Sequence, residues 1–421
     1  MSEAIRLDRL ANGFRVLTRR LPGVRSAAVG VWIDAGTRHE PAEANGVAHL
    51  LEHMAFKGTR TRTARDIACA IEAVGGSLNA WTSREHTAFH ARVLAEDVPL
   101  AVELLADILN EPLLDEAELA KEREVVLQEI GQVEDTPDDL VLDLLQEEAF
   151  PDQPLGRSIL GPAELVARMP RSALVDFMAT SYRPERMVLV GAGAVEHEAL
   201  LALAERWFGE RTPGPARPLE PARYRGGLRL EGRELEQVHL CLGVEGVSNH
   251  DPDFWAVQVL ACALGGGMSS RLFQEARENR GLCYAIDAVA ASYADTGLLS
   301  IYAGTGADQV GNLLEVVANE VRGLVGEPDP AEIARAKAQL RAGLLMALES
   351  CGAVADGIAR QLLVYGRPIP VEETLARIEA VDLEAVRRAG TRLFGAGGAT
   401  TAVAIGELET LPAPELGRVV G

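Results

Sequence analysis

The sequence predicts an α+β fold made of two similar halves, each with a mostly antiparallel sheet packed with helices. Three observations lead to this prediction. First, 48% of the 421 residues are hydrophobic, which is enough to bury two separate cores. Second, a linker rich in proline and glycine over residues 211–227 separates two segments of similar length, 1–210 and 228–421. Third, strand-like and helix-like patterns follow in the same order on both sides of this linker.

The expected elements can be read in order from the periodicity of the apolar residues. In the first half they are a strand over 27–33, helices near 45–56 and 63–74, strands near 77–83 and 86–94, several amphipathic helices, and a closing strand at 187–190. In the second half they are a strand near 237–244, helices near 252–263 and 269–279, strands near 284–291 and 296–303, further helices, and a closing strand at 401–405. Adjacent strands between long helical stretches favour an α+β layer over alternating β–α units.

The composition disfavours several classes of function. Lysine and arginine number 41 against 62 aspartates and glutamates, which gives a formal net charge of −21. Such a surface repels nucleic-acid phosphates and anionic lipid, and it attracts cationic partners such as basic peptides. The five cysteines include no CxxC pair, which argues against a disulfide framework and a thiolate zinc cluster. No secretory signal and no apolar run of about 18 residues is visible, so we expect a soluble intracellular protein.

The clearest chemical signal lies in the helix expected near 45–56. His49 and His53 are four positions apart, so on a helix both imidazoles project from one face and suit a single zinc ion. Glu52 lies three positions after His49, within reach of a metal-bound water as a general base. A solvated helix is the alternative, but the apolar neighbours of this pattern indicate burial, and buried histidines need partners. The order H-x-x-E-H is that of the inverted zincins.

A third zinc ligand is expected from another part of the chain. Catalytic zinc usually has three protein ligands and keeps its fourth position for water. The helix expected over 116–130 offers Glu122, Glu124 and Glu129, and their spacing alone does not choose between them. A helix so rich in glutamate is often no more than a solvated surface.

The run from His49 to Thr59 closely resembles the metal site of the pitrilysin-type M16 metallopeptidases, and most of all their short-chain subgroup, which contains the β subunit of the mitochondrial processing peptidase. Further segments resemble this family at residues 75–85, 122–130, 155–161 and 270–275. The resemblance implies a LuxS/MPP-like metallohydrolase fold, with a clam-shell cleft between the halves. It also implies that His49, His53 and Glu129 are the zinc ligands and that Glu52 is the base.

The resemblance assigns roles to further residues of the first half. Glu122 matches a supporting carboxylate that orients a histidine ligand. Asn79 and Ala80 match the edge strand along which the family holds its peptide, although Asn79 also suits a plain strand residue near a turn. The corresponding helix of the second half, over 254–262, contains no His or Glu. We therefore expect one Zn²⁺ per chain.

The second half and the helix after Glu129 also contain matches to the family. Arg277 and Tyr284 match an arginine–tyrosine pair that reaches the active site, with Arg280 as the rival arginine. Asp139 and Asp143 are four positions apart, and they fall where the processing peptidase has acidic residues linked to the recognition of basic peptides. A solvated helix face is the alternative for these acids.

Together these expectations describe a zinc-dependent endopeptidase in which Glu52 activates zinc-bound water, acting on extended, basic peptides inside a closed chamber. The alternative is a non-catalytic core, scaffold or peptide-binding subunit of the same family, whose members have eroded metal motifs. We expect a homodimer, because this chain holds both the metal motif and the Arg/Tyr region. A heterodimer with a metal-free homologue is the other arrangement. The expected location is a bacterial cytoplasm, with the organellar matrix as the alternative.

Overall fold

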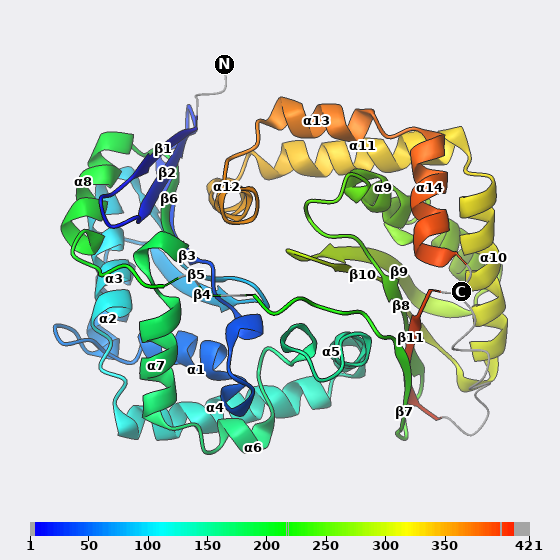
Figure 1. Cartoon of the computed structure of the whole chain (residues 1–421), viewed down its shortest axis with the longest axis horizontal. Helices are drawn as coiled ribbons and strands as arrows, with labels where there is room; N and C mark the ends of the chain where they lie inside the picture. Colours follow the sequence, from blue (N-terminus) through cyan, green and yellow to red (C-terminus); the bar gives the residue numbers. More distant parts are fainter. Residues whose placement is uncertain (1–4, 216, 218, 396–397, 408–421) are drawn as a thin grey trace. The chain divides into compact units, whose positions relative to one another are not determined.

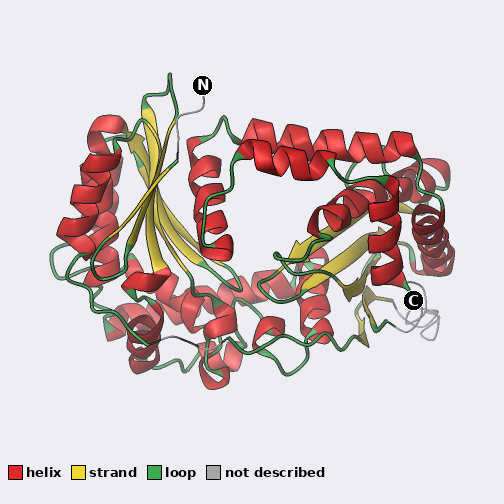
Figure 2. Ribbon diagram, turned by 45° about the horizontal axis from the view of Figure 1, so that its top comes forward, coloured by secondary structure: helices red, strands yellow, loops and turns green. Residues whose placement is uncertain are grey.

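The computed structural model describes residues 5–215, 217, 219–395 and 398–407, and it confirms the predicted α+β class (Figure 1). The residues fall into two compact units, each discontinuous in sequence. The first unit runs to Gly131 and adds Arg157–Glu220 and Leu345–Ile369. The second takes Gln132–Gly156, Pro221–Leu344 and the described residues from Pro370 onward. Each unit has one mixed sheet, drawn as yellow arrows among red helices in Figure 2.

The sheet of the first unit has six strands in the order β1-β2-β6-β3-β5-β4. Their bounds are Arg6–Arg9 (β1), Arg15–Arg20 (β2), Ser26–Ile33 (β3), Ser77–Thr82 (β4), Thr87–Leu94 (β5) and Met187–Gly193 (β6). The pair β2–β6 is parallel, and the other described pairs are antiparallel. β4 is therefore an edge strand, and its register with β5 sets Asn79 opposite His90 and Thr82 opposite Thr87.

Both faces of this sheet are covered, which explains why its central strands are apolar without alternation. All of β6 is buried, and so is β3 after its first residue. Val29 and Val31 of β3 point into a core shared with α1 (Val47–Ala55), α2 (Ala64–Glu72), α3 (Val98–Asn110), α7 (Arg171–Ser181) and α8 (His197–Phe208). Ala28 and Trp32 of the same strand point to the opposite face, against α12 (Cys351–Tyr365).

The sheet of the second unit has five strands in the order β7-β11-β8-β10-β9. Their bounds are Gly227–Gly232 (β7), Val238–Glu245 (β8), Cys283–Ser292 (β9), Gly297–Thr305 (β10) and Thr400–Gly406 (β11). One face packs against α9 (Phe254–Gly265), α10 (Val310–Gly326), α11 (Pro330–Ala347) and α14 (Leu383–Phe394). A further helix, α13 (Val371–Glu379), contacts α9. The other face packs against α5 (Pro137–Ala149). Here too each face of the sheet has its own helical layer.

Each sheet receives one of its helices from the other side of the linker (Figure 1). α12 lies far beyond the linker in sequence, yet it buries Val354 and Leu362 against the sheet of the first unit. α5 precedes the linker, yet it buries Leu144 and Leu145 against the sheet of the second unit. The domain boundaries 1–210, 211–227 and 228–421 stay a prediction, because packing alone does not say which segments fold as domains.

Most of the expected elements are confirmed. The strands expected at 27–33, 187–190 and 401–405 are β3, β6 and β11, and the two expected strand pairs are β4–β5 and β9–β10. The helix expected over 269–279 differs, because residues Phe273–Asn279 (η6) form a π-helix. Apolar periodicity does not separate these two kinds of helix over so short a segment.

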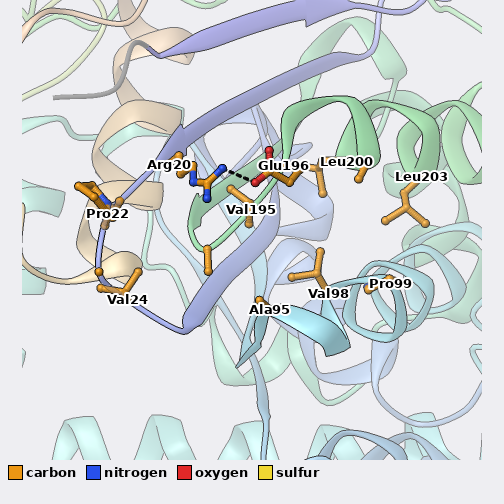
Figure 3. Close-up of a pocket in the computed structure, with 14 residues that line it drawn as sticks. Arg20, Pro22, Val24, Ala95, Val98, Pro99, Val195, Glu196, Leu200 and Leu203 are labelled. Atoms are coloured by element: carbon orange, nitrogen blue, oxygen red, sulfur yellow. Dashed lines mark hydrogen bonds and ion pairs between the residues drawn. The ribbon is translucent and has the colours of Figure 1, made fainter. Parts of the chain in front are cut away.

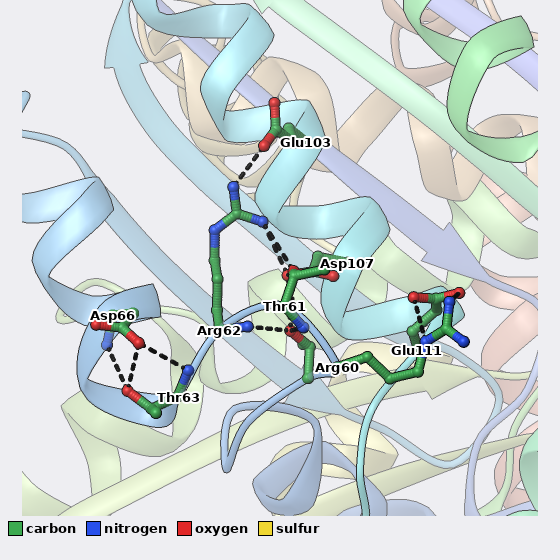
Figure 4. A network of polar contacts seen from close by, with 9 residues as sticks. Arg60, Thr61, Arg62, Thr63, Asp66, Glu103, Asp107 and Glu111 are labelled. Atoms are coloured by element: carbon green, nitrogen blue, oxygen red, sulfur yellow. Dashed lines mark hydrogen bonds and ion pairs between the residues drawn. The ribbon is translucent and has the colours of Figure 1, made fainter.

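The loop that leaves α1 is tied to α3 by a network of polar contacts (Figure 4). Arg62 forms ion pairs with Glu103 and, at 2.9 Å, with Asp107. Thr59 and Thr61 each donate a hydrogen bond of 2.8 Å to the same Asp107 oxygen. Because α3 is buried against the sheet, this network fixes the C-terminal end of α1 relative to the sheet.

A cavity of about 350 Å³ lies in the first unit, where the end of β2 meets α3 and α8 (Figure 3). Its walls are mostly aliphatic and include Val98, Val195 and Leu200. Arg20 and Glu196 form an ion pair within it. None of the residues of the H-x-x-E-H pattern lines this cavity, so it is separate from the chemistry that the pattern predicts.

Among the described helices, no single one is both long and apolar enough to cross a membrane. Only when the consecutive helices Pro330–Ala347 and Cys351–Tyr365 are taken together as a bent pair do their length and apolar composition reach those of a membrane span.

Candidate metal centre

The helix that carries the motif, α1, begins at a sharp turn that requires glycine. Gly46 has a φ of +97°, and a Cβ atom there would approach the carbonyl oxygen of Leu160 to 2.7 Å. The carboxylate of Glu40 then accepts the backbone N–H groups of Gly46 at 2.9 Å and Ala48 at 2.7 Å. Asn45 donates to the same carboxylate at 2.7 Å. These bonds satisfy N–H groups that the helix itself leaves unpaired, and they fix where α1 starts.

Three side chains of the first unit converge beside α1. His49 and His53 project from α1, and Glu129 comes from α4 (Glu116–Glu134). The Nε2 atom of each histidine lies 3.6 Å from Oε2 of Glu129, and the three ligand atoms all lie within 4.8 Å of one another. Among the described residues, this is the one group of three or more His, Cys, Asp or Glu side chains whose ligand atoms meet so closely.

The group has the dimensions and the donor atoms of a zinc site. Two bonds of about 2.1 Å at a tetrahedral angle place two donor atoms roughly 3.4 Å apart. Both histidine nitrogens lie close to that separation from the Glu129 oxygen, at 3.6 Å. Two imidazoles and one carboxylate form a donor set typical of catalytic zinc, with a fourth position left open. Of the three candidate glutamates, Glu129 is the one that joins the histidines.

Glu122 lies behind His53 rather than at the ligand position. It is 5% exposed, and its Oε2 lies 3.1 Å from Nδ1 of His53 while its Oε1 lies 2.7 Å from Nζ of Lys57. A proton on Nδ1 of His53, donated to Glu122, leaves Nε2 with the lone pair that a metal ion needs. Lys57 compensates the charge of the buried carboxylate. The contact is the one expected of a carboxylate that orients a histidine.

The two histidines differ in their second ring nitrogen. Nδ1 of His49 is buried and has no hydrogen-bond partner among the described residues, whereas Nδ1 of His53 contacts Glu122. Burial, and then the proximity of His53, lowers the pKa of His49 to about 4. The His49 imidazole is therefore neutral at pH 7, which is the form that binds a metal ion.

Glu52 lies on the same helix, and its carboxylate is held by the edge strand. The hydroxyl of Thr82, the last residue of β4, donates a hydrogen bond of 2.6 Å to Oε2 of Glu52. Burial raises the pKa of Glu52, while the Thr82 hydrogen bond and the proximity of His53 oppose this rise and Glu129 adds to it. A carboxylate whose pKa is raised by burial suits general-base chemistry.

Asn79 and Ala80 lie on β4, the edge strand itself. β4 pairs with β5 along one side, so its other side offers backbone N–H and C=O groups that an extended segment can bind. The side chain of Asn79 accepts the N–H group of Ala80 at 2.9 Å. Since Thr82 ends the same strand, the edge strand and Glu52 are linked by a single side chain.

Arg277 and Tyr284 lie in the second unit and contact each other. The guanidinium of Arg277 lies 4.8 Å from the ring centre of Tyr284 and 4.5 Å from that of Phe273. Arg280 instead forms an ion pair of 2.7 Å with Glu275. Tyr284 is 75% exposed, so its ring is available for further contacts. The structure thus joins Tyr284 to Arg277 and not to Arg280.

Asp139 and Asp143 lie on α5, also in the second unit. Asp139 is exposed and Asp143 is half-buried. Their spacing of four residues places both on one face of the helix. Burial raises the pKa of Tyr302 on β10 to about 12, and nearby carboxylates, including Asp138 and Asp139, add to this rise. The first turn of α5 therefore presents negative charge to the second sheet.

Three residues around the metal centre were not singled out from the sequence: Glu40, Lys57 and Thr82. The contact of Glu40 with α1 depends on a turn that no spacing rule describes. Lys57 lies in the family-like run, but nothing in the run marks it as the partner of a buried acid. Thr82 did carry a signal, because strand alternation places it on the same face of β4 as Ala80.

Comparison with known proteins adds an independent observation. Residues 15–163 match the family model Insulinase (Peptidase family M16), and residues 168–340 match the model Peptidase M16 inactive domain. The chain is 41% identical over 398 residues to an uncharacterized zinc protease of Mycobacterium tuberculosis, covering 93% of this chain and 91% of that protein. It is 39% identical over 385 residues to an uncharacterized zinc protease of Bacillus subtilis, covering 91% and 94%.

Solved structures show the same fold at lower identity. A protease from Helicobacter pylori superposes with a TM-score of 0.88 at 20% identity, covering 96% of this chain and 100% of that one. The M16 inactive-domain structure from Pseudomonas fluorescens gives the same TM-score and identity, covering 96% and 98%. These structures therefore share the fold of this chain over nearly its whole length.

Proposed function

The chain belongs to peptidase family M16, and from this premise we propose that it is a zinc-dependent endopeptidase that cleaves extended, basic peptides. One observation carries the proposal: His49, His53 and Glu129 converge at zinc-ligand distances, with Glu52 on the same helix as the two histidines. The bacterial relatives are named zinc proteases, which agrees with it. A non-catalytic scaffold of the family is the alternative, and the presence of all four residues argues against it.

The residues of the first unit have two separate roles, metal binding and proton transfer. His49, His53 and Glu129 would hold one zinc ion, which when bound acts as a Lewis acid that acidifies water and polarises a carbonyl group. Glu52 takes a proton from the attacking water at its carboxylate and then returns this proton to the nitrogen of the departing amine. Because burial raises its pKa, the carboxyl group of Glu52 can hold the proton between the two steps.

The substrate main chain adds to β4 as a further strand. The free side of β4 offers a ladder of backbone groups next to Asn79 and Ala80, so binding depends mainly on main-chain hydrogen bonds. Such binding accepts many side chains and requires an extended peptide. Folded segments, whose backbone groups are already paired, are poor substrates.

Arg277 and Tyr284 steady the oxygen of the scissile carbonyl group as negative charge develops on it. This assignment rests on the family resemblance and on the contact between the two side chains within the second unit. Arg277 is favoured over Arg280 because its guanidinium contacts the ring of Tyr284, whereas that of Arg280 pairs with Glu275.

Asp139 and Asp143 give the preference for basic peptides. A formal net charge of −21 attracts cationic substrates in general, and these two acids place part of that charge on one helix face. The preference therefore weakens as salt screens the charges. In the double variant Asp139→Asn, Asp143→Asn, the hydrolysis rate of basic peptides should fall relative to that of neutral peptides. If the ratio of the two rates stayed at its wild-type value, these acids would contribute only to the general surface charge.

The assembly and the location are part of the same proposal. One zinc ion per chain is expected, because α9 of the second unit contains no His or Glu. We favour a homodimer, since the chain holds both the metal motif and the Arg/Tyr region, over a heterodimer with a metal-free homologue. The relatives named above are bacterial, which supports a bacterial cytoplasm over an organellar matrix.

The deciding experiment compares the wild type with Glu52→Gln. Both proteins should bind one zinc ion per chain, measured by mass spectrometry of the metal. Hydrolysis of an unfolded basic peptide should fall by roughly 10²–10⁴-fold in the variant, the usual contribution of a general base. Zinc binding with wild-type hydrolysis by the variant would remove Glu52 from the mechanism. Zinc binding without any hydrolysis by the wild type would favour the scaffold alternative.

A further inference from the structure

Thr82 contacts Glu52, the carboxylate proposed as the general base. Its hydroxyl donates to Oε2 of Glu52 at 2.6 Å. Among the described residues, no other side chain forms a hydrogen bond with Glu52. An ionised carboxylate has only acceptor oxygens, so in this contact Thr82 must be the donor. Oε2 accepts this hydrogen bond, and Oε1, which accepts none from a described side chain, is the oxygen better placed to receive a proton.

The position of the Thr82 hydroxyl is set by the sheet and not by α1. Thr82 pairs with Thr87 in the ladder between β4 and β5. The hydroxyl of Thr87 is engaged elsewhere, because it donates to the carbonyl oxygen of Ala35 at 2.8 Å. Thr82 is also β-branched, so its side chain has few rotamers on a strand. The donor is therefore a fixed point at the end of the edge strand.

Glu52 without this contact would be free to move. A glutamate side chain loses rotamer entropy when it is fixed in one conformation, so it stays fixed only where a contact holds it. A base displaced by about 1 Å can lose on the order of 10²-fold in rate.

We propose that Thr82 is a positioning residue, which holds the carboxylate of Glu52 at a fixed place relative to the peptide-binding edge of β4. This inference rests on the proposed function, in which Glu52 is the base and β4 binds the peptide. The substrate binds β4 through backbone groups and does not use the Thr82 hydroxyl. Thr82 therefore contributes to the rate of the chemical step and not to peptide affinity.

The test replaces Thr82 by valine, which keeps the β-branched shape and removes the hydroxyl. In the Thr82→Val variant, kcat for an unfolded basic peptide should fall roughly 10- to 100-fold, because a hydrogen bond to a charged group is lost. KM should stay within about twofold of the wild-type value, because ground-state binding is not touched. Zinc affinity of the metal-free protein, measured by competition with a chelator, should not change. Thr82→Ser restores the hydroxyl and should restore most of kcat.

A matched control removes the same kind of hydrogen bond elsewhere in the unit. Thr63 donates its hydroxyl to Asp66 at 2.7 Å at the start of α2, so Thr63→Val also deletes a threonine–carboxylate bond, and it should leave kcat unchanged. In the double variant Thr82→Val, Glu52→Gln, the loss should be no greater than in Glu52→Gln alone, since Thr82 acts through Glu52.

Each outcome bears on one proposal. A wild-type kcat in Thr82→Val, or a Thr82→Ser variant as slow as Thr82→Val, would overturn the role of Thr82 while Glu52 stays the base. A drop in kcat for Thr82→Val that adds in full to that of Glu52→Gln would overturn it too. If Glu52→Gln hydrolyses peptide at the wild-type rate, the proposed function fails first, whatever Thr82→Val does.

Discussion

The helices α1 and α9 occupy the same place in the two units and have opposite characters. Each follows a central strand, β3 or β8, and precedes the strand pair at the edge of the sheet, β4–β5 or β9–β10. α9 is almost entirely apolar, and eight of its residues are buried. α1 is buried along one side, whereas its His49, Glu52 and His53 are only partly covered. The same position in a repeated fold is therefore filled by core side chains in one unit and carries the candidate metal site in the other.

The starts of the two helices are held by different polar contacts. The start of α1 is held by the carboxylate of Glu40, which accepts two backbone N–H groups. The side chain of Asp253, at the start of α9, makes no capping bond and pairs with Arg388 at 2.8 Å. The N–H group of Asp253 in turn donates to the side chain of Asp251 at 2.9 Å, so the start of α9 is held by an aspartate close in sequence and that of α1 by a glutamate in the preceding turn. The comparison suggests where substitutions will be costly for activity and where only for stability.

The largest expected effect comes from the ligands of α1. In His53→Ala, zinc content should fall from one ion per chain to near zero and peptide hydrolysis to background, because two protein ligands do not hold a catalytic zinc ion. The control is Gln258→Ala, which removes the amide of α9 that bonds to Ala290. It should keep the full zinc content and activity. Loss of zinc in the α9 variant would contradict the assignment of the metal ligands to α1 and not to α9.

A smaller loss of zinc binding is expected when Glu122, which contacts the ligand His53, is changed. Glu122→Gln keeps the size of the side chain but weakens its contacts with His53 and Lys57, so zinc affinity should fall about 10–100-fold. Competition with a chelator measures it. Glu118→Gln on the same helix, where Glu118 pairs with the exposed Lys121, is the control and should bind zinc as the wild type does. Equal affinities in the two variants would show that Glu122 does not support His53.

The smallest effect concerns the segments that lead into the two helices. His39 precedes α1, and its Nδ1 accepts the N–H group of Gly36 at 3.0 Å. Burial, and then the proximity of Arg217, His86 and Arg38, lowers the pKa of His39 to about 2 from its ordinary value of 6.5. As the pH falls, the folded state therefore binds a proton on His39 only at a much lower pH than the unfolded state does. Its contribution to stability is complete above pH 6.5 and is lost as the pH falls from there toward 2.

His39→Gln should therefore reduce the loss of stability in acid. Between pH 7.5 and 5.5 the free energy of unfolding should fall by about 1 kcal/mol less in the variant than in the wild type. Urea denaturation of both metal-free proteins measures this difference. His250, which precedes α9 and is exposed, provides the control variant His250→Gln. If the free energy of unfolding of His39→Gln depended on pH as that of the wild type does, protonation of His39 would not be the cause of the loss of stability in acid.

Much of the fold and of the chemistry follows from local sequence. Apolar runs predicted the central strands, because a strand covered on both faces has no polar side. The spacing of His49 and His53 predicted a metal-binding helix, because four residues make about one helical turn. Element order predicted two similar units. Each of these signals is carried by residues that are neighbours along the chain.

The contacts between distant segments were decided by the tertiary structure. Spacing left Glu122, Glu124 and Glu129 equal, and the packing of α4 against α1 brought Glu129 to the histidines and Glu122 behind His53. The contact between Thr82 and Glu52 joins a strand to a helix thirty positions away.

The helical layers were decided in the same way. α12 and α5 each cover a sheet on the other side of the linker in sequence. A short apolar helix carries no mark of which apolar face it will cover, because hydrophobic burial has no direction of its own. The sequence thus determined which residues are able to do chemistry, and three-dimensional packing decided which of them meet.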